Sequence, residues 1–192
     1  MLVHFIATRS NLEDDLKYFS RINRIVCDLG HTYTLDWVKQ AEEQTNSNDS
    51  DKNKEIDWKK LHDDNMNALA KADVVIAEAS SPSFSTGYLV AMALQQKKPV
   101  LVLKRKSAGG GEFYTGLSSD FLYSEKYTND NLQEIIAKFL QDNTIETKDM
   151  RFNFFIDRAI YNYLRWASFK SGKTKAEVLR ELVQREINKE DY

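Results

Sequence analysis

The chain has 192 residues and a formal net charge of -2, from 27 Lys and Arg against 29 Asp and Glu. A hydrophobic content of 42% suits a soluble globular protein, and the balanced charge excludes a surface that attracts polyanions as a whole. Cys27 is the single cysteine, which excludes an internal disulfide and a cysteine-based metal cluster. Because the sequence opens on an apolar strand pattern and contains no apolar run of about 18 residues, we expect a cytoplasmic protein without a membrane segment.

Strands and helices are predicted to alternate over residues 1–142. Residues 2–7 form the first predicted strand and 11–29 the first helix, with Asn11 as its N-cap and Cys27 in its apolar stripe. The further predicted strands are 31–36, 73–78, 99–103 and 121–127, and the further helices are 57–71, 86–97 and 130–141. This alternation predicts an α/β domain with an open parallel sheet and helices on both faces.

Two polar stretches interrupt this alternation. Residues 41–56 contain almost no apolar side chain and are predicted to be a surface loop, which either covers a cleft or is an inert insertion. Residues 104–116 include three consecutive glycines, which predicts either a flexible lid or a long crossover.

The pattern changes after a linker at 143–149, and residues 150–192 form a second predicted unit. Residues 150–156 alternate like a strand, and helices are predicted at 157–170 and 175–189. Gly172 suits the end of the first of these helices and Thr174 the start of the second. About forty residues bury too little surface to be stable alone, so we expect this unit to pair with a second copy in a homodimer or a higher even oligomer.

Five hydroxyl side chains follow the predicted strand 73–78, at the start of the next helix. In an open parallel sheet, ligands bind where strands end and where the following helix presents unpaired backbone N–H groups. The hydroxyls therefore suit the oxygens of a phosphate or a sugar, and Gly87 would let a ligand approach the backbone. Ordinary helix capping is the alternative, although one cap requires one hydroxyl. The hydroxyl residues are Ser80, Ser81, Ser83, Ser85 and Thr86.

The segment A-D-V-V-I-A-E-A-S-S-P-S-F-S-T-G-Y-L, with H-D-D-N-M-N-A-L-A-K before it and K-K-P-V-L-V-L after it, resembles the nucleoside 2-deoxyribosyltransferase superfamily. The resemblance is greatest to the 2'-deoxynucleoside 5'-phosphate N-hydrolase branch and extends over residues 2–141. F-I-A-T-R at 5–9 is similar to the first strand and phosphate-side turn of that branch. The resemblance implies a nucleoside or nucleotide ligand and no cofactor or metal. The residues expected to contact the ligand are Thr8, Arg9, Asn65, Ser81, Ser83, Ser85, Thr86 and Gly87.

The sequence departs from this family at its catalytic positions. The family uses a glutamate directly after Gly-Tyr to attack the anomeric carbon, and an aspartate on the preceding helix assists. An ungapped alignment places Leu89 at the glutamate position and Asn65 at the aspartate position, and neither side chain can perform those roles. We therefore expect no catalytic residues. The alternative is an N-glycosidase or transferase that uses another carboxylate, such as Glu78 or Asp64.

Residues 150–189, which include R-F-N-F-F-I-D-R-A-I-Y-N-Y-L-R-W, resemble a ribbon-helix-helix domain. The resemblance implies an obligate dimer whose paired strands read double-stranded DNA in the major groove, while a helix N-terminus binds a phosphate. Against DNA binding, Phe155 points outward, and residues 149–192 hold nine Lys and Arg against seven Asp and Glu, a net of +2. The alternative is a purely dimerising unit. The residues expected to contact DNA are Arg151, Asn153, Lys173, Thr174 and Lys175.

These observations lead to one principal hypothesis and two rivals. The principal hypothesis is a nucleotide-binding sensor domain without catalytic activity, fused to a ribbon-helix-helix unit that dimerises and binds DNA. The first rival is the N-glycosidase with a non-standard carboxylate, and the second is a structural dimer.

Overall fold

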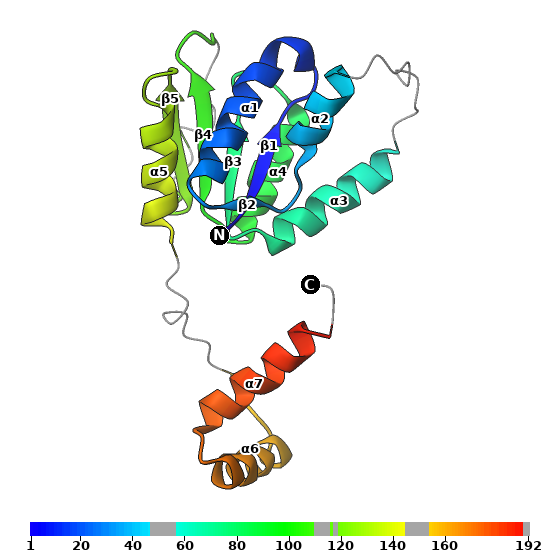
Figure 1. The fold of residues 1–192 in the computed structure, drawn as a ribbon, viewed down its shortest axis with the longest axis vertical. Helices are drawn as coiled ribbons and strands as arrows, with labels where there is room; N and C mark the ends of the chain where they lie inside the picture. The colour runs from blue at the N-terminus through cyan, green and yellow to red at the C-terminus, as the bar shows by residue number, and fades with distance from the viewer. Residues whose placement is uncertain (47–56, 110–115, 117–118, 145–153, 190–192) are drawn as a thin grey trace. The chain divides into compact units, whose positions relative to one another are not determined.

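The computed structural model describes residues 1–46, 57–109, 116, 119–144 and 154–189. The chain divides into two compact units, Met1–Thr144 and Ile145–Tyr192 (Figure 1). We call them unit 1 and unit 2 and describe each by itself.

Unit 1 contains a five-stranded sheet in the order β2-β1-β3-β4-β5, and every neighbouring pair is parallel. This confirms the predicted parallel α/β fold. In the central strand β3, every residue is buried, and its side chains alternate between two hydrophobic clusters. A continuous apolar run is what a strand covered on both faces requires. The strands are β1 (Leu2–Ala7), β2 (Thr32–Tyr33), β3 (Val74–Glu78), β4 (Val100–Arg105) and β5 (Leu122–Tyr127).

Helices cover both faces of the sheet, as the alternation predicted (Figure 1). On one face, Phe19, Ile22 and Val26 of α1 share a cluster with residues of α2 and α5. On the other face, Leu69 of α3 and Val90 of α4 pack against Val75 and Val102 of the sheet. The helices of unit 1 are α1 (Leu12–Asp28), α2 (Trp37–Asn46), α3 (Trp58–Lys71), α4 (Phe84–Gln95) and α5 (Leu132–Asp142).

Several sequence predictions in unit 1 need correction. The predicted strand 31–36 contains strand structure only at Thr32–Tyr33, and α2 begins at Trp37. The predicted loop 41–56 is helical up to residue 46, since Trp37, Val38 and Ala41 form a short buried stripe; residues 47–56 lie outside the described residues. The helix predicted at 86–97 begins earlier, at Phe84.

Cys27 was expected in the core, but it is exposed. The buried stripe of α1 runs through Phe19, Ile22 and Val26, and Cys27 lies about 100° around the helix from Val26. Its thiol contacts Asn23 Oδ1 at 3.4 Å.

The described part of unit 2 contains two helices, α6 (Arg158–Ser171) and α7 (Lys175–Ile187). Gly172 follows α6 with φ of 68°, a left-handed conformation that glycine adopts without strain. Thr174 caps α7 in a capping box with Glu177. Residues 154–156 have no regular structure, and residues 150–153 of the predicted strand lie outside the described residues.

The described side chains of unit 2 form a very small core. Leu164 and Val178 are buried, whereas Phe155 and Phe169 are exposed by 105% and 92%. Phe154, Ile156 and Ile160 are also exposed within one copy of the chain.

Candidate functional site

The strand order β2-β1-β3-β4-β5 places the topological switch point of the sheet at the carboxyl ends of β1 and β3. From β1 the chain continues to β2 on one side, whereas β3 lies on the other side of β1. Ala7 and Glu78, the last residues of β1 and β3, are register partners. In open α/β sheets, ligands bind beside such a reversal of strand order. Thr8 and residues 79–86, which lead from β3 into the first turn of α4 and which we call the serine-rich turn, therefore lie at the favoured edge of the sheet.

The hydroxyls at the start of α4 have distinct structural roles. Ser83 is the N-cap, and its Oγ accepts a hydrogen bond from the Thr86 backbone N–H at 3.3 Å. Ser83 Oγ also lies 2.9 Å from Ser85 Oγ. Thr86 is buried, and its Oγ1 has no hydrogen-bond partner within the described part of the chain. Ordinary capping therefore accounts for Ser83, but it leaves Ser85 and Thr86 unexplained.

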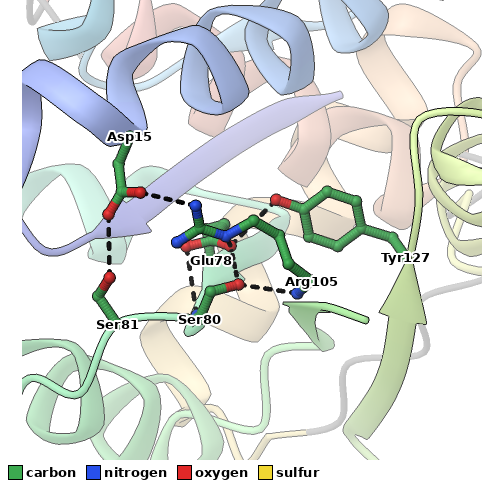
Figure 2. Close-up of polar contacts among 6 residues, drawn as sticks. All are labelled: Asp15, Glu78, Ser80, Ser81, Arg105 and Tyr127. Atoms are coloured by element: carbon green, nitrogen blue, oxygen red, sulfur yellow. Dashed lines mark hydrogen bonds and ion pairs between the residues drawn. The ribbon is translucent and has the colours of Figure 1, made fainter. Parts of the chain in front are cut away.

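The neighbouring serines belong to a buried ionic network, drawn in Figure 2. Ser81 Oγ donates to Asp15 Oδ2 at 2.9 Å, and Arg105 Nη1 lies 2.8 Å from Asp15 Oδ1. Arg105 Nε lies 3.6 Å from Glu78 Oε1. The network therefore links α1, the end of β3, the end of β4 and the serine-rich turn.

Glu78 has several further partners. Tyr127 donates its hydroxyl to Glu78 Oε1 at 3.0 Å, and Ser80 Oγ donates to the same oxygen. The Ser80 backbone N–H reaches Glu78 Oε2 at 3.3 Å. Ser80 Oγ in turn accepts the Arg105 backbone N–H at 2.7 Å. Both carboxylate oxygens of Glu78 are thus occupied by groups of the chain itself.

Burial dominates the electrostatics of this network. Glu78 is 0% and Asp15 is 3% exposed. Burial raises the pKa of Glu78, although the Ser80 hydroxyl, Arg105 and Tyr127 oppose the shift. Burial disfavours the charged form of Arg105, but Glu78 and Asp15 outweigh that effect and raise the pKa of its guanidinium. The ring of Tyr18 also lies 4.5 Å from the Arg105 guanidinium carbon.

The site also contains residues that were not predicted from the sequence: Asp15, Arg105 and Tyr127. The spacing of Asp15, Phe19 and Ile22 puts the carboxylate in phase with the buried stripe of α1. A charged residue in such a stripe requires a partner, so this signal could have revealed Asp15. Arg105 and Tyr127 carry no comparable signal, because their contacts depend on the pairing of β4 with β5.

The predicted ligand residues outside the serine-rich turn are divided between buried and exposed positions. Thr8 is buried, and its Oγ1 lies 3.0 Å from Ser10 Oγ. Arg9 is exposed and lies 4.7 Å from the ring centre of Trp37. An added Cβ at Gly87 would meet no described atom within 4 Å, so the backbone there is open.

Asn65 and Leu89, the side chains that the ungapped alignment pairs with the catalytic carboxylates of the resembling family, both have local contacts. Asn65 Nδ2 donates to the Leu61 carbonyl at 2.7 Å. Leu89 is partly buried and packs against the hydrophobic cluster that α3 and α4 share with the sheet. Next to it, Tyr88 OH lies 3.3 Å from His62 Nε2.

Two absences hold for the described residues. Among them, no three His, Cys, Asp or Glu side chains are grouped so that they could hold a metal ion. None of the described helices has the length and apolar character needed to cross a bilayer.

Sequence comparisons find relatives that match part of the chain. No family model matches the chain. A 5-hydroxymethyl-dUMP N-hydrolase of Tetraodon nigroviridis is 29% identical over 85 residues, which are 43% of this chain and 60% of that protein. A Danio rerio protein of the same name is 29% identical over 99 residues, 50% of this chain and 69% of that protein. A Trichoplax adhaerens protein, named among the 2'-deoxynucleoside 5'-phosphate N-hydrolases, is 31% identical over 44% of this chain and 60% of its own length. The match therefore spans about three fifths of the relatives from Tetraodon and Trichoplax.

A structural comparison agrees with these relatives at the level of the fold. The CMP N-glycosidase BcmB of Clostridium botulinum superposes with a TM-score of 0.52 at 13% identity, covering 71% of this chain and 99% of that protein. Unit 1 has the nucleoside 2-deoxyribosyltransferase-like α/β fold, and 2'-deoxynucleoside 5'-phosphate N-hydrolases are among its homologues.

Proposed function

We propose that unit 1 binds a nucleoside or nucleotide without cleaving it, and that unit 2 joins two copies of the chain. The observation that carries the proposal is the state of the carboxylates at the sheet edge. Leu89 stands where the resembling family has its nucleophile, and Glu78 and Asp15 are buried and held by Arg105. The protein then acts as a nucleotide sensor.

The same observation argues against the rival enzyme. A nucleophilic carboxylate needs a free oxygen that reaches the anomeric carbon. Both oxygens of Glu78 accept hydrogen bonds from the chain, and both oxygens of Asp15 are engaged by Arg105 and Ser81. Freeing either carboxylate would break one of the two ion pairs of Arg105 in a largely buried place, which carries a cost in free energy.

The ligand class follows from the homologues and from the edge itself. The names of the relatives describe hydrolases of deoxynucleoside monophosphates. The start of α4 offers unpaired backbone N–H groups together with the hydroxyls of Ser83 and Ser85. Arg9 adds a positive charge after β1, next to Thr8. A monophosphate therefore matches both the chemistry of the edge and the relatives.

Dimerisation is supported by the exposed apolar side chains of unit 2. Phe155, Trp166 and Phe169 are more than half exposed in one copy of the chain, and α6 and α7 bury little between them. Several large apolar side chains exposed on so small a pair of helices are typical of a surface that binds another protein surface. A second copy is the occupant that the ribbon-helix-helix resemblance implies.

DNA binding is the second candidate function of unit 2, and the described contacts favour it less. Lys173 forms an ion pair with Glu181, and Lys175 lies 4.4 Å from the ring centre of Tyr161. Thr174 binds the Glu177 carboxylate, which occupies the helix start where a DNA phosphate would lie. Arg151 and Asn153 lie outside the described residues.

Calorimetric titration with nucleosides and with their 5'-monophosphates tests the ligand. We expect Ser85→Ala to weaken monophosphate binding, whereas Ser171→Ala in unit 2 should leave it unchanged. If Ser85→Ala and Ser171→Ala bind the monophosphates with equal affinity, the placement of the phosphate at α4 is contradicted. Retention of promoter-region DNA fragments at low and at physiological salt tests the second candidate, because nonspecific electrostatic binding is lost between the two.

A further inference from the structure

Ser80 and Ser81 both direct their hydroxyl protons into the protein. Ser80 Oγ donates to Glu78 and Ser81 Oγ donates to Asp15. The serine hydroxyl is the donor in both hydrogen bonds, and each serine has a single proton to give. Toward a ligand, either oxygen can then act only as an acceptor.

Ser80 and Ser81 differ in whether their hydroxyl oxygen can still accept a hydrogen bond from a ligand. Ser80 is buried, and its Oγ already accepts the Arg105 backbone N–H at 2.7 Å. Ser81 is half-buried, and its described contact, 2.9 Å to Asp15 Oδ2, uses its proton. Asp15 is fixed by Arg105 on its other oxygen. Ser81 therefore presents acceptor lone pairs at the edge of the sheet.

The start of α4 has the opposite polarity. Its first backbone N–H groups point out of the helix and donate, and the helix dipole favours negative charge there. Ser83 Oγ accepts the Thr86 N–H, and Ser83 and Ser85 hydroxyls share one hydrogen bond, which leaves one of their two protons for a ligand. Donors and acceptors are thus separated along one short turn.

We propose that this separation orients the ligand: Ser81 accepts a hydrogen bond from a sugar hydroxyl, and the start of α4 binds the phosphate. The inference rests on the proposed function and adds to it which part of the nucleotide lies where. Asp15 and Arg105 are positioning residues in this arrangement, because they fix the direction of the Ser81 hydroxyl without touching the ligand. Ser81 therefore makes the protein bind nucleotides that carry a sugar hydroxyl more tightly than nucleotides that lack one.

The test compares a deoxynucleoside 5'-monophosphate with the 2',3'-dideoxy monophosphate of the same base, which lacks the sugar hydroxyls. In the wild-type protein we expect the deoxy ligand to bind about fivefold more tightly, the ratio that corresponds to a net hydrogen bond of about 1 kcal/mol. Ser81→Ala should bring the two affinities within about twofold of each other. Ser81→Thr keeps the hydroxyl and should restore the preference.

The ratio is measured on one protein sample with two ligands, so a partly unfolded fraction in Ser81→Ala cancels. Ser20→Ala removes a hydroxyl that donates to the Leu16 carbonyl within α1, and this control should keep the wild-type ratio. Equal affinities in the wild-type protein, or a fivefold preference that persists in Ser81→Ala, would overturn the inference while nucleotide binding stands. Failure of every nucleotide to bind would overturn the proposed function, and the inference with it.

Discussion

The guanidinium of Arg105 lies 2.8 Å from the carboxylate of Asp15, and this pair connects the end of β4 to the first turn of α1. Removing the cation would leave Asp15 and Glu78 as neighbouring buried carboxylates. We expect Arg105→Gln to lower the free energy of unfolding by about 3 to 5 kcal/mol.

The matched experiment is a double-mutant cycle by urea denaturation with Asp15→Asn, Arg105→Gln and the double variant. Because the double variant removes both charges, its loss of stability should be smaller than the sum of the single losses by at least about 1 kcal/mol. Additive losses would show that the pair is not coupled.

Tyr127→Phe should destabilise unit 1, because Glu78 Oε1 would lose the hydroxyl that donates to it at 3.0 Å. Leaving a buried acceptor partly unsatisfied costs about 1 to 3 kcal/mol. Tyr123→Phe, on the same strand but more than a third exposed, is the control and should change the melting temperature little. An equal effect of both substitutions would contradict the role given to Tyr127.

Different parts of this architecture were predictable to different degrees. The parallel sheet followed from the sequence because β3 and β4 are apolar runs between amphipathic helices. The short α2 was missed, since three buried side chains in a polar stretch carry a weak pattern. The serine-rich turn was located by its position after β3, whereas Arg105 joins Asp15 through contacts that only the folded chain creates.

His4 should make the stability of unit 1 depend on pH. Its side chain is fully buried; burial, and then the positive charge of Lys98, lower the pKa of His4 to about 4 from the ordinary 6.5. Between these values the unfolded chain takes up a proton that the folded protein does not. The stabilisation is therefore complete above pH 6.5 and falls as the pH drops toward 4, by about 3 kcal/mol in all.

Urea denaturation at a series of pH values measures this effect. The free energy of unfolding should depend less steeply on pH in His4→Gln than in the wild-type protein between pH 6.5 and 4, because the uptake of one proton on unfolding is lost. His62→Gln, at an exposed position, is the control. A slope in His4→Gln equal to that of the wild-type protein would rule out His4 as the cause.

The dimer prediction concerns the apolar face of α7. Val183 is 52% exposed in one copy, and a charge there would be buried between two copies. We expect Val183→Glu to convert the dimer to a monomer in light scattering, whereas Gln184→Glu, its exposed neighbour, should remain dimeric. A wild-type protein that is already monomeric, or a Val183→Glu variant that stays dimeric, would contradict pairing through this face.

The central claim is that unit 1 binds a nucleotide and leaves the glycosidic bond intact. It is tested most directly by mixing the wild-type protein with each deoxynucleoside monophosphate, recording the melting temperature, and then separating the same mixtures by chromatography. A ligand present at 100 times its dissociation constant stabilises the native state by about 2.7 kcal/mol. We therefore predict a raised melting temperature with at least one monophosphate and no released base. Release of free base in amounts above the protein concentration, abolished by Glu78→Gln or Asp64→Asn, would contradict the account and make the protein an N-glycosidase.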